Sequence, residues 1–421
     1  MAEPTTPKEI LILGGSYGGL STAHYLLKHA IPSLPSKESY RLTLISASSQ
    51  VLCRPACPRA LISDTMFAQE KLFVDIPPLF TQYPAENFRF IHGTATELDT
   101  TARTVAVKLE SESGGENQVE KITFHALVIA TGASTPSPLM GLNHTSQSLR
   151  KSWVEFREAL PTAKTIIISG GGPAGIETAG ELGEYLNGRA GWFTSKLSNP
   201  KVAITVITAG SEILPALRPS IAQTAEKYLA KVGVEVSKNT RVVSVVPAEA
   251  GSETGVASKA TVTLDNGKTV EADLYIPCTG TSPNTSFVPK ELVVADGRIE
   301  TNTTTLRVDH AGPRVYALGD VSSSAHPAIH VLFPAIPILC ANVKKDLLLA
   351  AGKEESEVGE DRVFKEDKSE TQIVPIGKSR GVGAAMGWRL PSWMIWAIKG
   401  RDYWLWTTGN LWSGKQWAKE E

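Results

Sequence analysis

The sequence has little of several features that define large classes of proteins. Four cysteines in 421 residues exclude a small secreted fold held together by disulfides. A formal net charge of -1 leaves no basic footprint of the kind that nucleic-acid-binding proteins carry. No stretch approaches the roughly 20 consecutive apolar residues that span a bilayer, and the first residues lack the basic and apolar regions of a secretory signal. We therefore expect an intracellular, cytoplasmic protein without a nucleic-acid partner.

Two parts of the chain show the same order of elements. An apolar run at 9–13 meets a glycine-rich turn, a helix-like stretch and a second apolar run at 41–46. The stretch 165–209 repeats this order. A strand, a glycine turn, a helix and a second strand form a βαβ unit. The repeat predicts an α/β fold with two Rossmann-like domains.

The two glycine turns fit the binding of dinucleotides. The second turn has the complete spacing, with Gly170, Gly172 and Gly175. In the first turn, Ser16 stands where a second glycine is expected. Glycines let the backbone approach a pyrophosphate, whose charge then faces the free N–H groups of the following helix. The small hydroxyl of Ser16 can still fit there and donate a hydrogen bond.

The choice between NADH and NADPH stays open in the sequence. An acidic residue at the end of the second strand would bind a ribose 2′-hydroxyl, but Ser46 and Thr208 occupy these places. The lack of a clear ligand for a 2′-phosphate favours NADH. Arg218, however, lies close to Thr208 in the sequence.

Further motifs follow in a fixed order. They are VIATG at 128–132, CTGTSPNT at 278–285 and RVYALGDV at 314–321. With the two glycine turns, this set resembles the flavoproteins that have two dinucleotide-binding domains. Three more stretches are similar to the apoptosis-inducing-factor-like group, which includes the ferroptosis suppressor protein and resembles type II NADH dehydrogenases. These stretches are SSQVLCRPACPRAL (48–61), VPIGKSRGVGAAMGW (374–388) and IKGRDYW (398–404).

The resemblance implies a fold of the pyridine nucleotide-disulfide oxidoreductase type with a C-terminal aromatic-rich segment. It implies an FAD-binding domain from 1–150 and 290–350, and an NAD(P)H-binding domain at 151–289. A charged linker at 351–370 and a C-terminal acceptor-site or membrane-proximal segment at 371–421 would follow. Polar stretches at 111–119 and 247–260 are interpreted as hairpin tips.

The resemblance also implies a set of cofactor-binding residues. Asp320 would hold the ribityl chain of FAD, the backbone of Ala95 would face the adenine, and Thr131 would turn the chain beside the cofactor. The expected FAD residues are Gly14, Gly15, Ser16, Tyr17, Gly18, Gly19, Arg59, Ala95, Thr131, Gly132 and Asp320. The residues expected to bind the nicotinamide dinucleotide are Gly170, Gly172 and Gly175.

Three charged residues are catalytic candidates by the same resemblance. Lys399 would lie near the flavin ring and stabilise its reduced, anionic form. Glu177 and Glu181 would bind the nicotinamide amide or ribose, or relay a proton. The competing interpretations are an exposed helix face for the two glutamates and a solvated charge for Lys399. No His/Cys spacing indicates a metal site.

These parts favour an FAD-dependent oxidoreductase that passes electrons from NAD(P)H to a quinone or similar hydrophobic acceptor. A competing hypothesis is a thiol or disulfide reductase using Cys53 and Cys57, which stand near the place of the Cys-x4-Cys pair of disulfide reductases but are spaced Cys-x3-Cys. The same motifs also fit a redox-sensing signalling flavoprotein or a tailoring oxidoreductase of a specialised metabolite. The protein is expected to be a monomer or a homodimer.

Six of the nine tryptophans fall between residues 393 and 417. The alternation over 403–408 favours a strand, so we expect most of these side chains to lie in the core. The remainder would roof a hydrophobic acceptor site. Between 388 and 421, five Lys or Arg face three acids, which suits weak peripheral contact with an anionic membrane surface.

Overall fold

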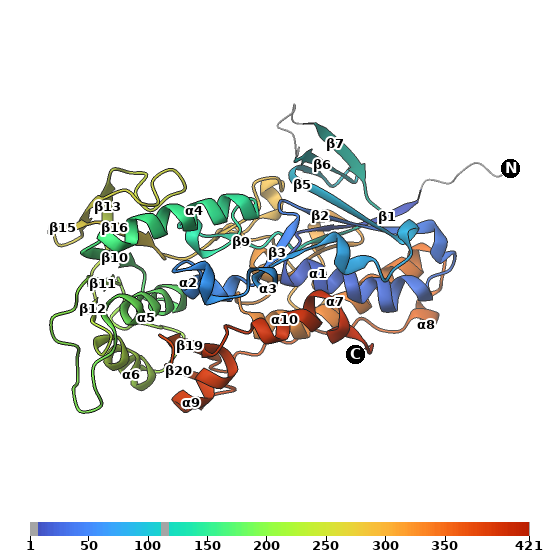
Figure 1. The fold of residues 1–421 in the computed structure, drawn as a ribbon. Coiled ribbons are helices and arrows are strands. Elements are labelled where there is room, and N and C mark those ends of the chain that lie inside the picture. Colours follow the sequence, from blue (N-terminus) through green and yellow to red (C-terminus); the bar gives the residue numbers. More distant parts are fainter. Residues whose placement is uncertain (1–6, 111–117, 421) are drawn as a thin grey trace.

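The computed structural model describes residues 7–110 and 118–420. The first six residues, which belong to the stretch tested for a secretory signal, lie outside the described part, as does most of the expected hairpin tip at 111–119. Within the described residues, two sheet-based domains lie side by side, and the C-terminal segment runs along one side of both (Figure 1).

The first domain is built on a seven-stranded sheet in the order β18-β8-β1-β2-β5-β6-β7. Its first five strands in that order are parallel neighbours, and β6 and β7 continue β5 as an antiparallel extension. The expected strands at 9–13 and 41–46 are confirmed as β1 and β2. The bounds are β1 Lys8–Leu13, β2 Tyr40–Ser46, β5 Phe88–Asp99, β6 Thr104–Leu109, β7 Val119–Thr123, β8 Ala126–Ile129 and β18 Val315–Ala317. Helices α1 (Tyr17–Tyr25) and α7 (Ile329–Ala350) pack together on one face.

The second domain repeats the design with a four-stranded parallel sheet in the order β12-β11-β10-β16. An antiparallel sheet β13-β14-β15 lies beside it, and the stretch 247–260 connects β13 with β14, as expected. The strands are β10 Thr165–Ser169, β11 Ala203–Ile207, β12 Val234–Ser237, β13 Val242–Val246, β14 Ala260–Leu264, β15 Thr269–Ala272 and β16 Leu274–Pro277. The helices are α4 Ser146–Ala159, α5 Pro173–Asn187 and α6 Pro219–Ala230.

Short elements connect and decorate the two domains. Strand β9 pairs with β17, so the chain that leaves the first domain lies against the chain that returns to it. The short elements are β3 Gln50–Leu52, α2 Cys57–Ala60, α3 Gln69–Leu72, β4 Phe73–Asp75, β9 Ala133–Ser134, β17 Ser282–Pro283 and α8 Glu355–Val358.

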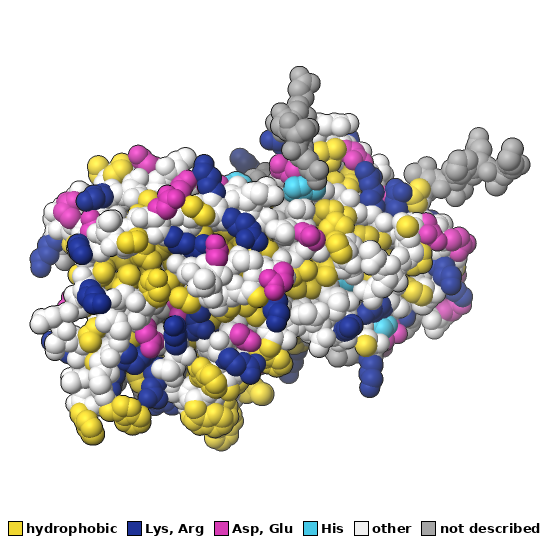
Figure 2. Space-filling view, in the orientation of Figure 1, with side chains coloured by type: hydrophobic (Ala, Val, Ile, Leu, Met, Phe, Trp, Pro, Cys, Tyr) yellow, Lys and Arg dark blue, Asp and Glu magenta, His cyan; other side chains and the backbone are white. Residues whose placement is uncertain are grey.

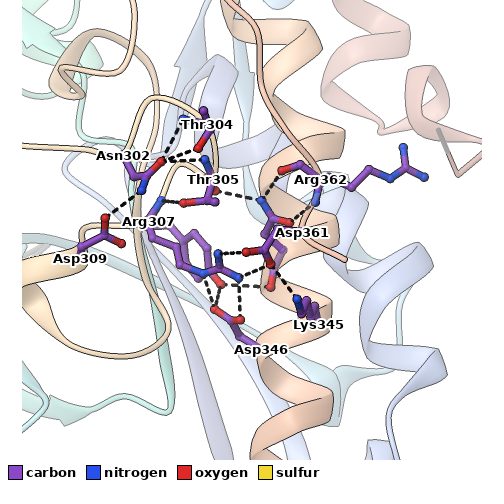
Figure 3. Close-up of polar contacts among 11 residues, drawn as sticks. Asn302, Thr304, Thr305, Arg307, Asp309, Lys345, Asp346, Asp361 and Arg362 are labelled. Atoms are coloured by element: carbon purple, nitrogen blue, oxygen red, sulfur yellow. Dashed lines mark hydrogen bonds and ion pairs between the residues drawn. The ribbon is translucent and has the colours of Figure 1, made fainter. Parts of the chain in front are cut away.

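The charged stretch 351–370, here called the strap, is attached to the first domain rather than running free. Phe364 of the strap is buried in the first domain's core, and its N–H donates to the carbonyl of Thr304. Arg307 lies between two carboxylates, Asp346 of α7 and Asp361 of the strap, and makes paired bonds of 2.7–2.9 Å to each (Figure 3). The sequence shows the strap's charge but not these attachments.

The C-terminal segment is mainly helical where the sequence predicted a strand. Residues 405–408 begin helix α10 (Leu405–Trp412), because Leu405, Thr408 and Leu411 recur at helical spacing and are buried. The strand prediction for 403–408 was therefore wrong. The other elements are β19 Gln372–Ile376, β20 Arg380–Ala385, β21 Trp388–Arg389 and α9 Ser392–Ile395.

The expected burial of most C-terminal tryptophans was also wrong. Only Trp412 and Trp417 of the six are buried, in the core between α1 and α7. Trp393, Trp396 and Trp406 are exposed, while Ile395 faces β20 from the other side of α9. Figure 2 shows apolar side chains gathered along the lower edge, where Figure 1 places α9. Within the described residues, no helix has the length and apolar character needed to cross a membrane.

Candidate functional site

The expected FAD site lies where three neighbouring strands end. Strands β1, β8 and β18 are adjacent and parallel. Their carboxyl ends lead into Gly14, Thr131–Gly132 and Gly319–Asp320 respectively. Ligands of such sheets bind beyond this edge. The fold therefore brings these three motifs together in space, whereas the sequence shows only their order along the chain.

The glycine turn after β1 requires glycine at two positions, for steric and conformational reasons. A Cβ on Gly19 would lie 1.7 Å from the carbonyl oxygen of Gly14, and Gly14 itself has a φ of +114°. Ser16 is exposed at the N-cap of α1, and its hydroxyl makes no capping bond. The helix N-terminus is thus open to a phosphate, as FAD binding requires. Ala95 lies in β5, three residues beyond its parallel pairing with β2.

Arg54, which the sequence reasoning missed, is the cation beside Asp320. Its Nη1 lies 3.8 Å from the Asp320 carboxylate and donates to the carbonyl of Ala133 at 3.1 Å. Arg59, the expected arginine, is instead buried in contact with the second domain. Both arginines occur in the same CRPACPRAL stretch, so only the fold distinguishes them. A role for Arg59 at the flavin stays a prediction.

The second glycine turn leaves room for a nucleotide. A Cβ on Gly172 would meet no atom within 4 Å, while one on Gly170 would lie 2.2 Å from the carbonyl oxygen of Cys278. Gly172 is the N-cap of α5, and it has no side chain to occupy the helix N-terminus. Gly175 lies in the first turn of the same helix. This arrangement suits the pyrophosphate of a nicotinamide dinucleotide.

Helix α5 also carries a buried ion pair with the C-terminal segment. The Nζ of Lys399 lies 2.5 Å from Oε1 of Glu177, and it also donates to the carbonyl of Ile373 at 3.2 Å. Lys399 is 6% exposed and Glu177 is 3% exposed. These values exclude the solvated charge and the exposed helix face as interpretations. The sequence candidates Glu177 and Lys399 are therefore brought into direct contact.

One turn further along α5, Glu181 forms a second buried pair. Arg59 donates to both of its carboxylate oxygens, with Nε at 2.9 Å and Nη2 at 2.7 Å. The hydroxyl of Tyr403 adds a bond of 3.0 Å to the same carboxylate. The guanidinium carbon also lies 4.8 Å from the centre of the Tyr403 ring. Segments from both domains and from the C-terminus thus meet at one carboxylate.

The two glutamates differ in their partners, since Glu177 contacts an ammonium and Glu181 a guanidinium. Burial raises the pKa of Glu177 to about 7, although Lys399 opposes this shift. A carboxyl group that titrates near neutral pH can both hold and release a proton. Glu181 accepts two hydrogen bonds from Arg59, and such a bidentate pair fits a role in positioning α5.

The backbone beside Lys399 has an unusual conformation. Tyr403 and Trp404 are consecutive residues with φ of 52° and 68°, the left-handed region that bulky residues rarely adopt. This turn directs both rings toward the ammonium of Lys399, with centroids at 5.6 and 5.0 Å. Such strained residues are concentrated at functional sites. The ammonium is thereby enclosed by aromatic surface and one carboxylate.

The thiols of the second hypothesis are poorly suited to redox chemistry. Cys53 and Cys57 are both free and buried. Burial raises the pKa of Cys53 to about 11 and that of Cys57 to about 12. Because the thiolate is the reactive form, this environment disfavours a thiol relay. The Cys53 sulfur instead contacts the hydroxyl of Tyr17 at 3.6 Å and the carbonyl of Tyr403 at 3.5 Å.

The end of the chain is held against the first domain by basic side chains of α1 and the turn after it. His24 binds the carbonyl of Trp412, His29 binds that of Trp417, and Lys28 donates to Gly414. The carbonyl of Trp412 is the last of α10 and that of Gly414 follows it closely, so donors and positive charge are favourable there. The carbonyl of Trp417 belongs to the short helical turn at Lys415–Trp417. Burial lowers the pKa of His24 to about 4, so it binds as a neutral ring.

These features define a flavoprotein that uses a nicotinamide dinucleotide. The family model described as pyridine nucleotide-disulphide oxidoreductase matches residues 8–333, and the chain belongs to this family. It is an NAD(P)H-dependent flavoprotein oxidoreductase with FAD and NAD(P)H as cofactors.

The chain is similar to named proteins over nearly its whole length. It is 62% identical to Oxidoreductase phnG of Penicillium herquei, with 99% of each chain covered. It is 24% identical to human Ferroptosis suppressor protein 1, covering 93% of this chain and 92% of that protein. Among solved structures, NDH2 from Plasmodium falciparum in complex with NADH matches with a TM-score of 0.65 and 14% identity, over 98% of this chain and all of that one. The expected resemblance and fold class are thus confirmed.

Proposed function

We propose that this oxidoreductase transfers electrons from NAD(P)H through FAD to a quinone or a similar hydrophobic acceptor. The observation that carries the proposal is the buried Lys399–Glu177 pair, which the C-terminal segment completes on the nicotinamide-binding domain. A buried cation and a carboxyl group that titrates near pH 7 can serve a reaction that gathers negative charge and consumes a proton.

The overall reaction requires two electrons and two protons at the acceptor. NAD(P)H supplies two electrons and one proton as a hydride, and becomes NAD(P)⁺. FAD supplies the hydride-accepting and electron-transferring chemistry when it is bound. The second proton comes from the medium, so NAD(P)H, a proton and a quinone yield NAD(P)⁺ and a quinol. The chain must therefore hold one proton beside the acceptor.

Glu177 is the residue we assign to this proton. Its Oε1 faces the Lys399 ammonium, and its pKa of about 7 leaves it partly protonated at neutral pH. Lys399 stabilises the negative charge that develops as electrons arrive. Glu181 binds Arg59 and the hydroxyl of Tyr403, and Arg59 also donates to the carbonyl of Arg401. These bonds hold α5 against the C-terminal segment and keep Glu177 in reach of Lys399.

The aromatic surroundings favour a hydrophobic acceptor. Tyr403 and Trp404 border Lys399, and Tyr17 of the first glycine turn lies 4.7 Å from the ring of Trp412. Aromatic walls of this kind bind flat, apolar molecules well. The raised thiol pKa values disfavour the thiol hypothesis.

An acceptor screen on the purified, FAD-loaded protein tests the proposal. Reduced nicotinamide should bleach the flavin absorbance without oxygen, and short-chain quinones should restore it faster than oxygen does. Ferricyanide, which needs no proton, serves as the control acceptor. If quinones restore the absorbance no faster than oxygen, the quinone proposal is wrong.

We further propose peripheral contact with an anionic membrane surface through the exposed aromatic face of the C-terminal segment. Trp388, Trp393, Trp396 and Trp406 are exposed there. Arg401 lies 5.9 Å from the ring of Trp406, so positive charge accompanies the aromatic surface. Indole rings and basic side chains together suit the interface between headgroups and acyl chains. An apolar acceptor could then be drawn from the membrane.

A further inference from the structure

The loop between β11 and α6, residues 208–218, leaves the carboxyl edge of the second sheet. In Rossmann-like domains, the residues that follow the second strand bind the adenosine ribose and its 2′ substituent. The loop packs on the glycine turn, because the N–H of Leu214 donates to the carbonyl of Gly171 at 2.7 Å. A Cβ on Gly171 would lie 2.8 Å from Oγ1 of Thr208. The 2′-phosphate of NADPH would therefore arrive beside this loop.

Arg218 is the cation of this loop, and its guanidinium is bound by a carboxylate of the strap. Its Nε lies 2.7 Å from Oε2 of Glu370. Its Nη2 donates to the same carboxylate and to the carbonyl of Gly387, and its backbone N–H donates to the other oxygen of Glu370. Arg218 is the N-cap of α6, so its position is fixed by the helix as well as by the strap. The guanidinium is thus masked by a carboxylate 152 residues away.

A second cation, at the end of the neighbouring strand β12, is masked in the same way. Lys238 follows β12, and its Nζ lies 3.0 Å from Glu226 and 3.4 Å from Glu212. Two cations therefore face three carboxylates. A phosphate monoester carries a charge of about -1.5 to -2 at neutral pH, and it would meet excess negative charge here. The 2′-hydroxyl of NADH carries no charge and would not be repelled.

We propose that Glu370 of the strap makes the protein select NADH over NADPH by masking Arg218. The inference rests on the proposed function, because it concerns the nicotinamide substrate of the same reaction. Glu370 acts through Arg218 and is a residue that determines specificity, not a catalytic one.

Redox-inert ligands test the selection by binding alone. Calorimetry on the FAD-loaded protein compares ADP-ribose with its 2′-phosphate, and the phosphorylated ligand should bind at least about tenfold more weakly. In Glu370→Gln, the released Arg218 should strengthen binding of the 2′-phosphate by about tenfold. Binding of ADP-ribose should stay the same.

Two matched variants separate masking from loosening of the strap. Glu366→Gln breaks another strap contact, the 2.6 Å bond to His326, but leaves Arg218 masked, so selectivity should not change. Arg218→Gln combined with Glu370→Gln should remove the gain in 2′-phosphate binding. The proposal is overturned if the wild type binds both ligands equally, or if Glu370→Gln and Glu366→Gln act alike.

The rate of flavin bleaching distinguishes a failure of this inference from a failure of the proposed function. If NADH and NADPH bleach the flavin with equal efficiency, the selection is wrong and the oxidoreductase assignment stands. If neither nucleotide bleaches the flavin, the proposed function fails, and the inference fails with it.

Discussion

The ammonium of Lys399 lies 2.5 Å from the carboxylate of Glu177, although 222 residues separate the two in the sequence. Both side chains are buried, so the pair fixes the C-terminal segment on α5 of the second domain. Breaking a buried ion pair from one side leaves an uncompensated charge. The two residues should therefore behave as one unit in stability and in activity.

Replacing Lys399 with Met should lower the free energy of unfolding by about 3–5 kcal/mol, because Glu177 loses its partner in a buried site. Adding Glu177→Gln to this variant should restore much of the lost stability. Urea unfolding of the two single variants and the double variant measures this coupling. Additive effects of the two substitutions would contradict a direct pair.

Acceptor reduction should depend on pH through Glu177. Because its pKa is about 7, its proton is present below pH 7 and is lost as the pH rises. Its raised pKa also means that the folded protein binds this proton more tightly than the unfolded chain does. This contribution to stability is present below about pH 4.5 and is lost as the pH rises through about 7.

Stopped-flow reoxidation by a quinone between pH 5 and 9 measures the first effect, and thermal unfolding over the same range measures the second. In Glu177→Gln, both dependences should flatten. Lys399→Met should move the activity midpoint above pH 7, because Lys399 lowers the pKa of Glu177. A midpoint that stays in place in both variants would assign the proton to another group.

The double substitution of Cys53 and Cys57 by Ala should leave acceptor reduction within about twofold of the wild type. Burial keeps both thiols protonated, with pKa values of about 11 and 12. Steady-state kinetics with a quinone and with a disulfide substrate provides the measurement. If the double variant keeps its FAD but loses quinone activity, the result supports the thiol hypothesis.

Releasing the strap should destabilise the protein. Arg307→Met removes the guanidinium that Asp346 and Asp361 share, at a cost of about 3 kcal/mol, although Lys345 still contacts Asp361 at 3.1 Å. Arg307 holds the pKa of Asp361 at about 2, so this stabilisation is present above about pH 4 and is lost as the pH falls toward 2. Urea unfolding at pH 7 and pH 3 measures both effects.

Lys353→Met is the matched control for the strap, because its partner Glu357 is equally exposed. It should change the free energy of unfolding by less than about 0.5 kcal/mol. Equal losses in the two variants would mean that the strap is held elsewhere.

Replacing Trp393, Trp396 and Trp406 with Ser should weaken binding to anionic vesicles without changing turnover of a water-soluble quinone. These indole rings are exposed and support no core. Co-sedimentation with vesicles of mixed anionic and neutral lipids measures the binding. Val246→Ser removes an exposed apolar side chain of β13, in the second domain, and serves as the control. If it weakens binding equally, the proposed face is wrong.

The fold was largely predictable because its signals are local. The apolar runs at 9–13 and 41–46 end at special turns, and such runs form buried parallel strands. The tail was harder, because 403–408 alternates like a strand. Residues 405–412 form a helix because this conformation packs one face against α1. Thr408 and Trp412 are buried on that face, one turn apart.

The sequence allowed candidate residues to be named, but it did not show which of them are in contact. Glu177 and Lys399 could be named, but their pairing depends on how the tail returns to α5. The bond between Arg59 and Glu181 crosses 122 residues and leaves no periodic trace in the sequence. The strap contains a single buried aromatic residue, Phe364, and one such residue does not form a pattern.

Lys399 follows both sheet-based domains in the sequence, and this sets the order in which its pair with Glu177 can form. Chains fold from the N-terminus during synthesis, so the two dinucleotide-binding domains can be complete while Lys399 is still to be added. Until Tyr403 and Trp412 dock, Glu177 has no cationic partner. A chain that stops short would thus keep its nucleotide-binding turns and lack its charged centre. The pair between Lys399 and Glu177 can therefore form only after both sheet-based domains have been synthesised.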